Sequence, residues 1–158
     1  RPSNVDNYSD LERCVSLLLA VSQKINVVFS MHPRTKSSLI EYGLFDSLVD
    51  NKEINIIEPC GYLDFLKLIS SSRLILTDSG SIQTESSILD VPCITLRDDT
   101  ERPSTITYGT NILVGQNLNS AINEVKLNLK NPKKSKNMDL WDGKAAVRIA
   151  KILKTYLS

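Results

Sequence analysis

Short apolar runs rich in β-branched residues alternate with segments of helical spacing along almost the whole chain. The runs expected to form strands are Ile25–Met31, Ile54–Ile57, Leu74–Leu76, Cys93–Leu96 and Ile112–Val114. The segments expected to form helices are Asp10–Ser22, Lys36–Tyr42, Tyr62–Ser70, Ile82–Leu89, Leu118–Leu129 and Lys144–Leu157. Alternation with short connections is typical of a parallel sheet covered by helices on both faces. The sequence therefore predicts an α/β domain with a Rossmann-like, doubly wound parallel sheet.

Local signals predict where some of these elements begin and end. Ser9 or Asp10 is available to cap the helix of Asp10–Ser22. Gly43 is expected to stop the helix that ends near Tyr42, because glycine adopts the left-handed backbone of a helix end at no steric cost. The polar stretch Asn131–Asn137 is expected to form a solvated loop.

The composition excludes several classes of partner. With 158 residues, 41% of them hydrophobic, the chain is long enough for one domain with a buried core. A formal net charge of +1, without a basic stripe among aromatic residues, gives no reason to expect binding to nucleic acid or to a membrane. No apolar run approaches the roughly 20 residues that cross a bilayer.

Cysteine usage indicates the compartment. Cys14, Cys60 and Cys93 are odd in number and widely spaced, and each lies in or beside an apolar segment. Such residues are typical of reduced, buried cysteines in a cytoplasmic protein. A single histidine and the lack of a CxxC pair disfavour a metal site.

The first residues resemble the loop that follows a strand. Arg1-Pro2-Ser3-Asn4 leads directly into the first helix, and no strand precedes it. In a doubly wound sheet the strand that feeds this loop is central. We therefore expect residues 1–158 to be a fragment of a longer chain, a single domain that lacks its first strand. Unpaired strand edges in such a fragment favour strand exchange or association.

The stretch Thr77–Ser81 has the composition of a phosphate-binding turn. A strand ends at Thr77, and the small residues Asp78-Ser79-Gly80-Ser81 lead into the next helix. The start of a helix carries unpaired N–H donors and a partial positive charge, both of which attract anions. Serines that act only as helix caps explain the same pattern, and the turn alone does not separate the two interpretations.

Three further side chains are candidates for the same edge of the sheet. Glu85 lies one helical turn beyond Ser81, where a carboxylate takes ribose hydroxyls in other nucleotide folds; a solvent-facing glutamate is the alternative. Arg102 lies in the charged loop after a strand and suits phosphate oxygens, or it pairs locally with Asp98, Asp99 or Glu101. His32 ends another strand at this edge, or is a plain surface histidine.

Three segments resemble, in order and spacing, the non-hydrolysing UDP-N-acetylglucosamine 2-epimerases. They are DSGSIQTE at Asp78–Glu85, RDDTERP at Arg97–Pro103 and GTNILVG at Gly109–Gly115. Segments at Arg1–Asp6, Met31–Pro33 and Asp142–Ala145 also look like family segments. The resemblance covers the full 158 residues, but only the C-terminal half of the family's two-domain, glycosyltransferase-B-like fold.

The resemblance implies which residues bind a UDP-sugar. In the family, backbone groups near the position of Phe65 hold the uracil, and Glu85 would take the ribose hydroxyls. Ser79, Gly80 and Ser81 would hold the diphosphate at the helix N-terminus.

Arg102 would line the same cleft. Arg1 and His32 match positions near it that serve a second, regulatory UDP-sugar in some bacterial members. Two features depart from the family pattern. Ser81 replaces the second glycine of the turn, which fits if the local φ angle is negative. The histidine expected immediately before Arg1, a diphosphate contact, is absent from the sequence.

The implied reaction is inversion at C2 of the sugar by elimination and re-addition of UDP, which interconverts UDP-N-acetylglucosamine and UDP-N-acetylmannosamine. It uses no metal, nicotinamide or other cofactor, and it supplies N-acetylmannosamine units for surface polysaccharide. The acid/base carboxylates belong to the N-terminal domain, so the fragment alone is expected to be inactive. The full-length enzyme is expected to be a cytoplasmic homodimer.

Three alternatives remain open at this point. The parent enzyme could act on a modified UDP-sugar such as a diacetamido uronic acid. The domain could be a non-catalytic UDP-binding module, to which Ser81 gives some weight. A glycosyltransferase of the same fold is disfavoured, because Arg97–Pro103 and Gly109–Gly115 point to epimerases.

Overall fold

The computed structural model describes residues 2–136 and 139–157, in which strands and helices alternate as expected. The strands are β1 (Val27–Ser30), β2 (Ile54–Ile57), β3 (Ile75–Thr77), β4 (Cys93–Thr95) and β5 (Asn111–Leu113). The longer helices are α2 (Tyr8–Ser22), α3 (Pro33–Glu41), α5 (Tyr62–Ser71), α6 (Gly80–Ile88), α8 (Leu118–Lys130) and α9 (Ala145–Leu157). The short helices α1 (Pro2–Val5), α4 (Phe45–Val49) and α7 (Pro103–Thr107) were not expected, because four or five residues are too few to show an apolar period.

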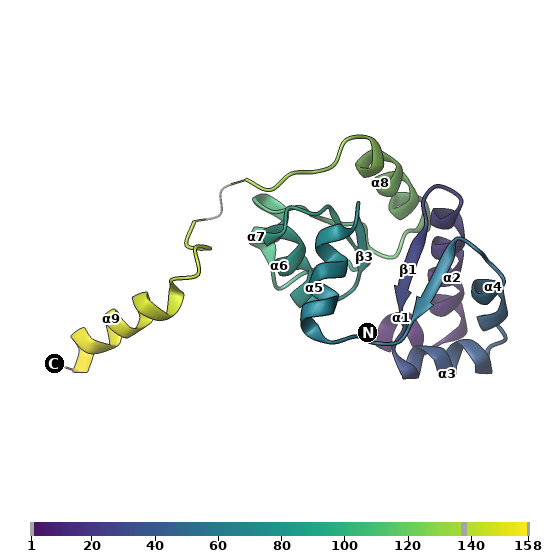
Figure 1. Cartoon of the computed structure of the whole chain (residues 1–158), viewed down its shortest axis with the longest axis horizontal. Coiled ribbons are helices and arrows are strands. Elements are labelled where there is room, and N and C mark those ends of the chain that lie inside the picture. The colour runs from purple at the N-terminus through teal and green to yellow at the C-terminus, as the bar shows by residue number, and fades with distance from the viewer. Residues whose placement is uncertain (1, 137–138, 158) are drawn as a thin grey trace.

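All described strand pairs are parallel, which confirms the α/β class. The strands form two groups (Figure 1): β1 pairs with β2, and β3, β4 and β5 form a second group with β4 at its centre. No strand pairing joins β1 to β3 within residues 2–136 and 139–157. Instead of one continuous sheet, the described chain therefore has two parallel ribbons whose facing edges are unpaired.

Helix α2 holds the two groups together. Leu11 and Val15 belong to a core cluster with β2 and helices α3 and α4. Leu17 and Val21, further along α2, belong to a second cluster that includes Ile94 of β4. Burial of a leucine or valine side chain stabilises a fold by about 1.5–3 kcal/mol. One amphipathic helix therefore contributes several such side chains to both halves of the core.

Polar caps determine where the helices begin and end. Asn7 caps α2 by accepting a hydrogen bond from the N–H of Asp10 at 2.9 Å, so the expected cap at Ser9 or Asp10 is wrong. The reason is that α2 starts at Tyr8 and therefore needs its acceptor one residue earlier. The stop at Gly43 is confirmed, because α3 ends just before this glycine and its φ angle is +67°.

The loop after α8 is anchored rather than fully solvated. Lys133 is half-buried, and its Nζ donates to the carbonyl oxygens of Ile106 at 2.8 Å and Asn111 at 2.7 Å. Burial lowers the pKa of this lysine. Asp90 accepts from Lys134 and Ser135 of the same loop. The prediction of a solvated loop is therefore wrong for 133–135, and Asn137 lies outside the described residues.

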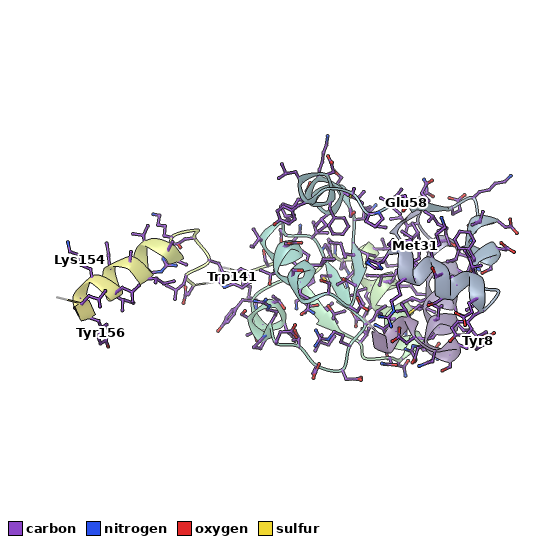
Figure 2. All side chains as sticks on the ribbon, turned by 90° about the horizontal axis from the view of Figure 1, so that it is seen from below. Tyr8, Met31, Glu58, Trp141, Lys154 and Tyr156 are labelled. Atoms are coloured by element: carbon purple, nitrogen blue, oxygen red, sulfur yellow. The ribbon has the colours of Figure 1, made fainter. Side chains whose placement is uncertain are left out.

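Helix α9 has the apolar spacing expected of an amphipathic helix, but none of its residues is buried. Figure 1 shows it apart from the α/β body, and Figure 2 shows Lys154 and Tyr156 on it, away from the rest of the molecule. Its exposed apolar side chains include Val147, Ile152 and Leu153. Among the residues that the structure describes, no helix is long and apolar enough to span a membrane.

The three cysteines are free. Cys93 is buried in β4 and Cys14 is partly buried in α2. Cys60 is exposed, so its expected burial is wrong, because it lies in the loop between β2 and α5 with exposed neighbours on both sides.

Candidate functional site

The turn between β3 and α6 has the geometry of an anion-binding helix start. Ser79 is the N-cap residue in extended conformation, and α6 begins at Gly80. The N–H of Ser79 is held by Thr77 Oγ1 at 3.1 Å, and the hydroxyls of Ser79 and Ser81 are hydrogen-bonded at 3.2 Å. The side chain of the N-cap residue Ser79 makes no capping hydrogen bond to α6. The first N–H groups of α6 and the two hydroxyls therefore lie together at the helix start.

The backbone at Ser81 is compatible with serine. Ser81 is the second residue of α6, and the only described non-glycine residues with positive φ are Asp90 and Leu140. The negative φ angle that a serine needs at this position is therefore present. The departure from two glycines removes no backbone donor and adds a hydroxyl.

Gly80 is needed for a close approach, not for an unusual φ angle. A Cβ atom at this position would lie 2.6 Å from Oε1 of Glu101. The loop between β4 and α7 therefore lies directly against the turn. Two segments that are about twenty residues apart in the sequence form one surface here.

The charged residues of this loop have separate roles. The Arg97 side chain, only 13% exposed, forms ion pairs with Asp99 at 3.1 Å and with Glu101 at 3.0 Å. These are the local pairings that the sequence also allowed for Arg102. Arg102 itself is exposed, and no hydrogen bond or ion pair engages its guanidinium within the described chain. Arg97 therefore orders the acidic residues, and the fork of Arg102 is available to a ligand.

Glu85 and Phe65 lie on adjacent helices beside the turn. Glu85 is partly buried on α6, one turn beyond Ser81. Phe65 lies in the first turn of α5, and its N–H is already bonded to the carbonyl oxygen of Gly61 at 2.9 Å. Helix α5 packs against α6 (Figure 1). A ligand near Phe65 would therefore meet the other backbone groups of this helix start.

His32 lies at the end of β1, in the other group of strands. It is exposed and is the N-cap of α3, where its Nδ1 accepts from the N–H of Arg34 at 3.2 Å. This side chain therefore has a structural task in addition to any contact with a ligand. Arg1 lies outside the described residues.

Asn4 contacts the first residue of the turn, Asp78. Its buried side chain donates to Asp78 Oδ2 at 2.8 Å and so joins α1 to the end of β3. Burial raises the pKa of Asp78, and the hydrogen bond from Asn4 acts in the opposite direction.

A buried polar cluster under the site was not predicted. Gln83 accepts hydrogen bonds from Thr100 at 2.6 Å and from Asn111 at 3.0 Å. Asn111 also donates to Thr105 at 3.0 Å and accepts from Thr95 at 2.6 Å. One sequence signal could have revealed this cluster. Gln83, Ser86 and Ser87 are polar at the spacing of one helix face, where a helix that packs on a sheet normally has apolar residues.

No three His, Cys, Asp or Glu side chains come together as a metal site in 2–136 and 139–157. The turn offers N–H donors and hydroxyls, and the exposed guanidinium of Arg102 lies on the loop that contacts it; these are typical ligands of phosphate oxygens, although the carboxylates of Asp78 and Glu101 also lie at the turn.

Comparison with known proteins identifies the relatives of this chain. The family model described as UDP-N-acetylglucosamine 2-epimerase matches residues 1–154. The UDP-N-acetylglucosamine 2-epimerase of Methanocaldococcus jannaschii is 48% identical over 155 residues, which are 97% of this chain and 42% of the relative. The UDP-2,3-diacetamido-2,3-dideoxy-D-glucuronate 2-epimerase of Pseudomonas aeruginosa is 34% identical and covers 94% of this chain and 41% of that protein.

Solved structures agree with these matches. The crystal structure of the M. jannaschii enzyme in complex with UDP-GlcNAc and UDP superposes with a TM-score of 0.85, at 48% identity. The match covers 98% of this chain and 43% of that structure. The expected fold is therefore confirmed, and the chain spans about two fifths of the length of these relatives.

Proposed function

Because the chain belongs to the UDP-N-acetylglucosamine 2-epimerase family, we propose that it is the UDP-binding part of a longer enzyme that interconverts UDP-N-acetylglucosamine and UDP-N-acetylmannosamine. One observation carries this proposal. The uncapped start of α6, with the hydroxyls of Ser79 and Ser81, lies against the loop of Arg102. These donors suit a diphosphate.

The role of this chain is to bind UDP and to stabilise it as a leaving group. Backbone N–H groups and hydroxyls of Ser79, Gly80 and Ser81 hold the diphosphate, and Arg102 balances the charge that develops on it. Glu85 takes the ribose hydroxyls, and backbone groups near Phe65 hold the uracil. Donors already ordered by α6 need no rearrangement when the C–O bond to the sugar breaks.

The proton chemistry at C2 belongs to the rest of the longer enzyme. We propose that a second α/β domain supplies the acid/base carboxylates, because the relatives are more than twice as long as this chain. We also propose that a strand from the preceding residues pairs with both β1 and β3. The two parallel groups with unpaired facing edges support this, since such a strand would make one continuous sheet.

Calorimetric titration with UDP tests the binding role, and an assay of epimerisation after removal of metals tests the reaction. The full-length protein should bind UDP and interconvert the two UDP-sugars in the presence of EDTA. If it binds UDP without epimerising any UDP-sugar, it is a binding module. If it does not bind UDP, the assignment of the turn is wrong.

A second candidate function is epimerisation of a modified UDP-sugar. The Pseudomonas aeruginosa relative, named for a diacetamido glucuronate substrate, favours this alternative. Rates with a panel of UDP-sugars distinguish the candidates. Preference for the diacetamido uronic acid would replace UDP-N-acetylglucosamine as the substrate.

We further propose that the full-length enzyme is a cytoplasmic homodimer. Its ligand is the UDP-sugar. The free cysteines support a reducing compartment, and the uncovered apolar side chains of α9 leave a surface for contacts within the longer protein or between its copies. Sedimentation equilibrium of the full-length protein tests the dimer. A monomer at micromolar concentration would contradict it.

A further inference from the structure

The side chain of Gln83 is fully buried beneath the candidate site. Its Oε1 accepts from Thr100 Oγ1 at 2.6 Å and from Asn111 Nδ2 at 3.0 Å. Since the amide nitrogen of Asn111 can only donate, Gln83 must present its oxygen to this pair. The Gln83 amide nitrogen has no hydrogen-bond partner in the described part of the chain. An unpaired buried donor destabilises the fold. The Gln83 amide keeps this orientation because its oxygen accepts two hydrogen bonds.

Thr100 connects Gln83 to Arg102 by hydrogen bonds. Its hydroxyl donates to Gln83 and accepts from the backbone N–H of Arg102 at 3.0 Å. A hydroxyl has one proton and two acceptor lone pairs, so both bonds form at the same time. Two consecutive hydrogen bonds therefore connect the side chain of Gln83 to the backbone of Arg102.

Gln83 also lies on the helix that forms the other half of the site. It is the fourth residue of α6, directly after the turn that presents Gly80 and Ser81. The relay Gln83–Thr100–Arg102 therefore joins the helix start to the loop with the free guanidinium. Glu101 of this loop lies close to Gly80 of the helix start, so the two segments are in contact.

We propose that Gln83 and Thr100 are positioning residues, which hold Arg102 at the distance from the turn that a diphosphate requires. The inference rests on the proposed function, because it presumes that UDP binds at this turn. Neither side chain touches the ligand. Both act through Arg102.

Thr100 is the better residue to change. Gln83→Leu would remove the acceptor of the Thr100 hydroxyl and of one of the two bonds from the amide nitrogen of Asn111, and it would endanger folding. Thr100→Val removes the hydroxyl and preserves the shape, whereas Thr100→Ser preserves the hydroxyl. In the full-length protein, we expect Thr100→Val to weaken UDP binding about tenfold, the loss of one charge-assisted contact. Thr100→Ser should retain most of the affinity.

A double-mutant cycle with Arg102→Ala separates positioning from general damage. Without the guanidinium there is nothing to position, so Thr100→Val should then change UDP affinity less than about twofold. Ser22→Ala is the matched control. It removes a buried hydroxyl that, like the hydroxyl of Thr100, both donates and accepts, to the carbonyl oxygen of Leu19 at 2.9 Å and from Asn51 at 3.0 Å, and these partners lie outside the polar cluster of Gln83. It should lower the unfolding midpoint and leave UDP affinity within about twofold.

The outcomes distinguish the relay from the function on which it rests. If the wild-type protein binds UDP but Thr100→Val lowers UDP affinity equally with Arg102 and with Arg102→Ala, the relay alone is overturned. The same holds if Thr100→Val does not lower UDP affinity at all. A loss of UDP affinity in Ser22→Ala as large as that in Thr100→Val also overturns it. If the wild-type protein does not bind UDP, the proposed function fails and the relay fails with it.

Discussion

Gly80→Ala should separate the stability of the fold from its ability to bind UDP. The φ angle at Gly80 is not positive, so alanine is allowed there and restricts the unfolded chain, a gain of about 0.4–1 kcal/mol. The new Cβ would lie 2.6 Å from Oε1 of Glu101, the end of a flexible side chain that is 51% exposed. That carboxylate turns away and gives up its pair with Arg97, a loss of about 0–1 kcal/mol at this exposure.

These two effects nearly cancel, so the free energy of unfolding should stay within about 1 kcal/mol of wild type. The unfolding midpoint should then move by no more than about 2–4 °C, as measured by calorimetry. On the proposed function, UDP affinity should fall at least about tenfold, because the methyl group crowds the backbone N–H groups of the helix start that would bind the diphosphate. UDP titration of the full-length variant measures this loss.

Gly43→Ala is the matched control. Gly43 has a φ angle of +67° and open space around its Cβ position, so alanine there is strained without a clash. It should lower the free energy of unfolding by about 1 kcal/mol and leave UDP affinity unchanged. The role of Gly80 as a site of close approach is refuted if Gly80→Ala binds UDP as tightly as wild type. It is also refuted if Gly80→Ala unfolds more easily than Gly43→Ala.

Three further changes test the exposed arginine, the bridging helix and the anchored loop. Arg102→Ala should weaken UDP binding about 10- to 100-fold by titration with an unchanged unfolding midpoint; a lower midpoint would reveal a structural role. Leu17→Ala should lower the free energy of urea unfolding by about 2–5 kcal/mol, since this buried side chain joins α2 to the core of β4 and α8; a loss below that range would mean that α2 does not bridge the halves.

Asp90→Asn completes this set. The bonds from Lys134 and Ser135 lower the folded-state pKa of Asp90, so its contribution to stability is present above the unfolded pKa and is lost as pH falls through the folded pKa. The variant should be less stable than wild type at neutral pH and equal to it at acidic pH, by urea unfolding; a difference independent of pH would contradict this.

Much of the local structure follows from the sequence because it depends on neighbouring residues. Apolar residues that repeat every two positions indicate a strand, and those that repeat every 3.6 positions indicate a helix. These patterns, and the glycine that follows Tyr42, depend only on residues close together in the sequence. The strands and the longer helices are therefore found close to their expected bounds. The turn of Ser79–Ser81 is predictable for the same reason, since a strand, small residues and a helix follow one another directly.

The interior polar contacts depend on residues far apart in the chain, and sequence periodicity does not report them. Asn4 meets Asp78, and Lys133 meets the carbonyl oxygen of Asn111. The sequence also does not predict whether Arg97 or Arg102 forms the ion pairs with the acidic residues of the loop. Arg97 and Arg102 flank the same acidic residues, and the three-dimensional course of the loop determines that Glu101 pairs with Arg97.

The central claim is that this chain supplies the diphosphate site of a UDP-sugar epimerase, and a crystal structure of the full-length protein with UDP tests it most directly. The account predicts diphosphate oxygens at about 2.7–3.2 Å from backbone nitrogens of the Ser79–Ser81 turn and from the guanidinium of Arg102. UDP bound with its diphosphate away from this turn, or with Arg102 turned from it, would contradict the account.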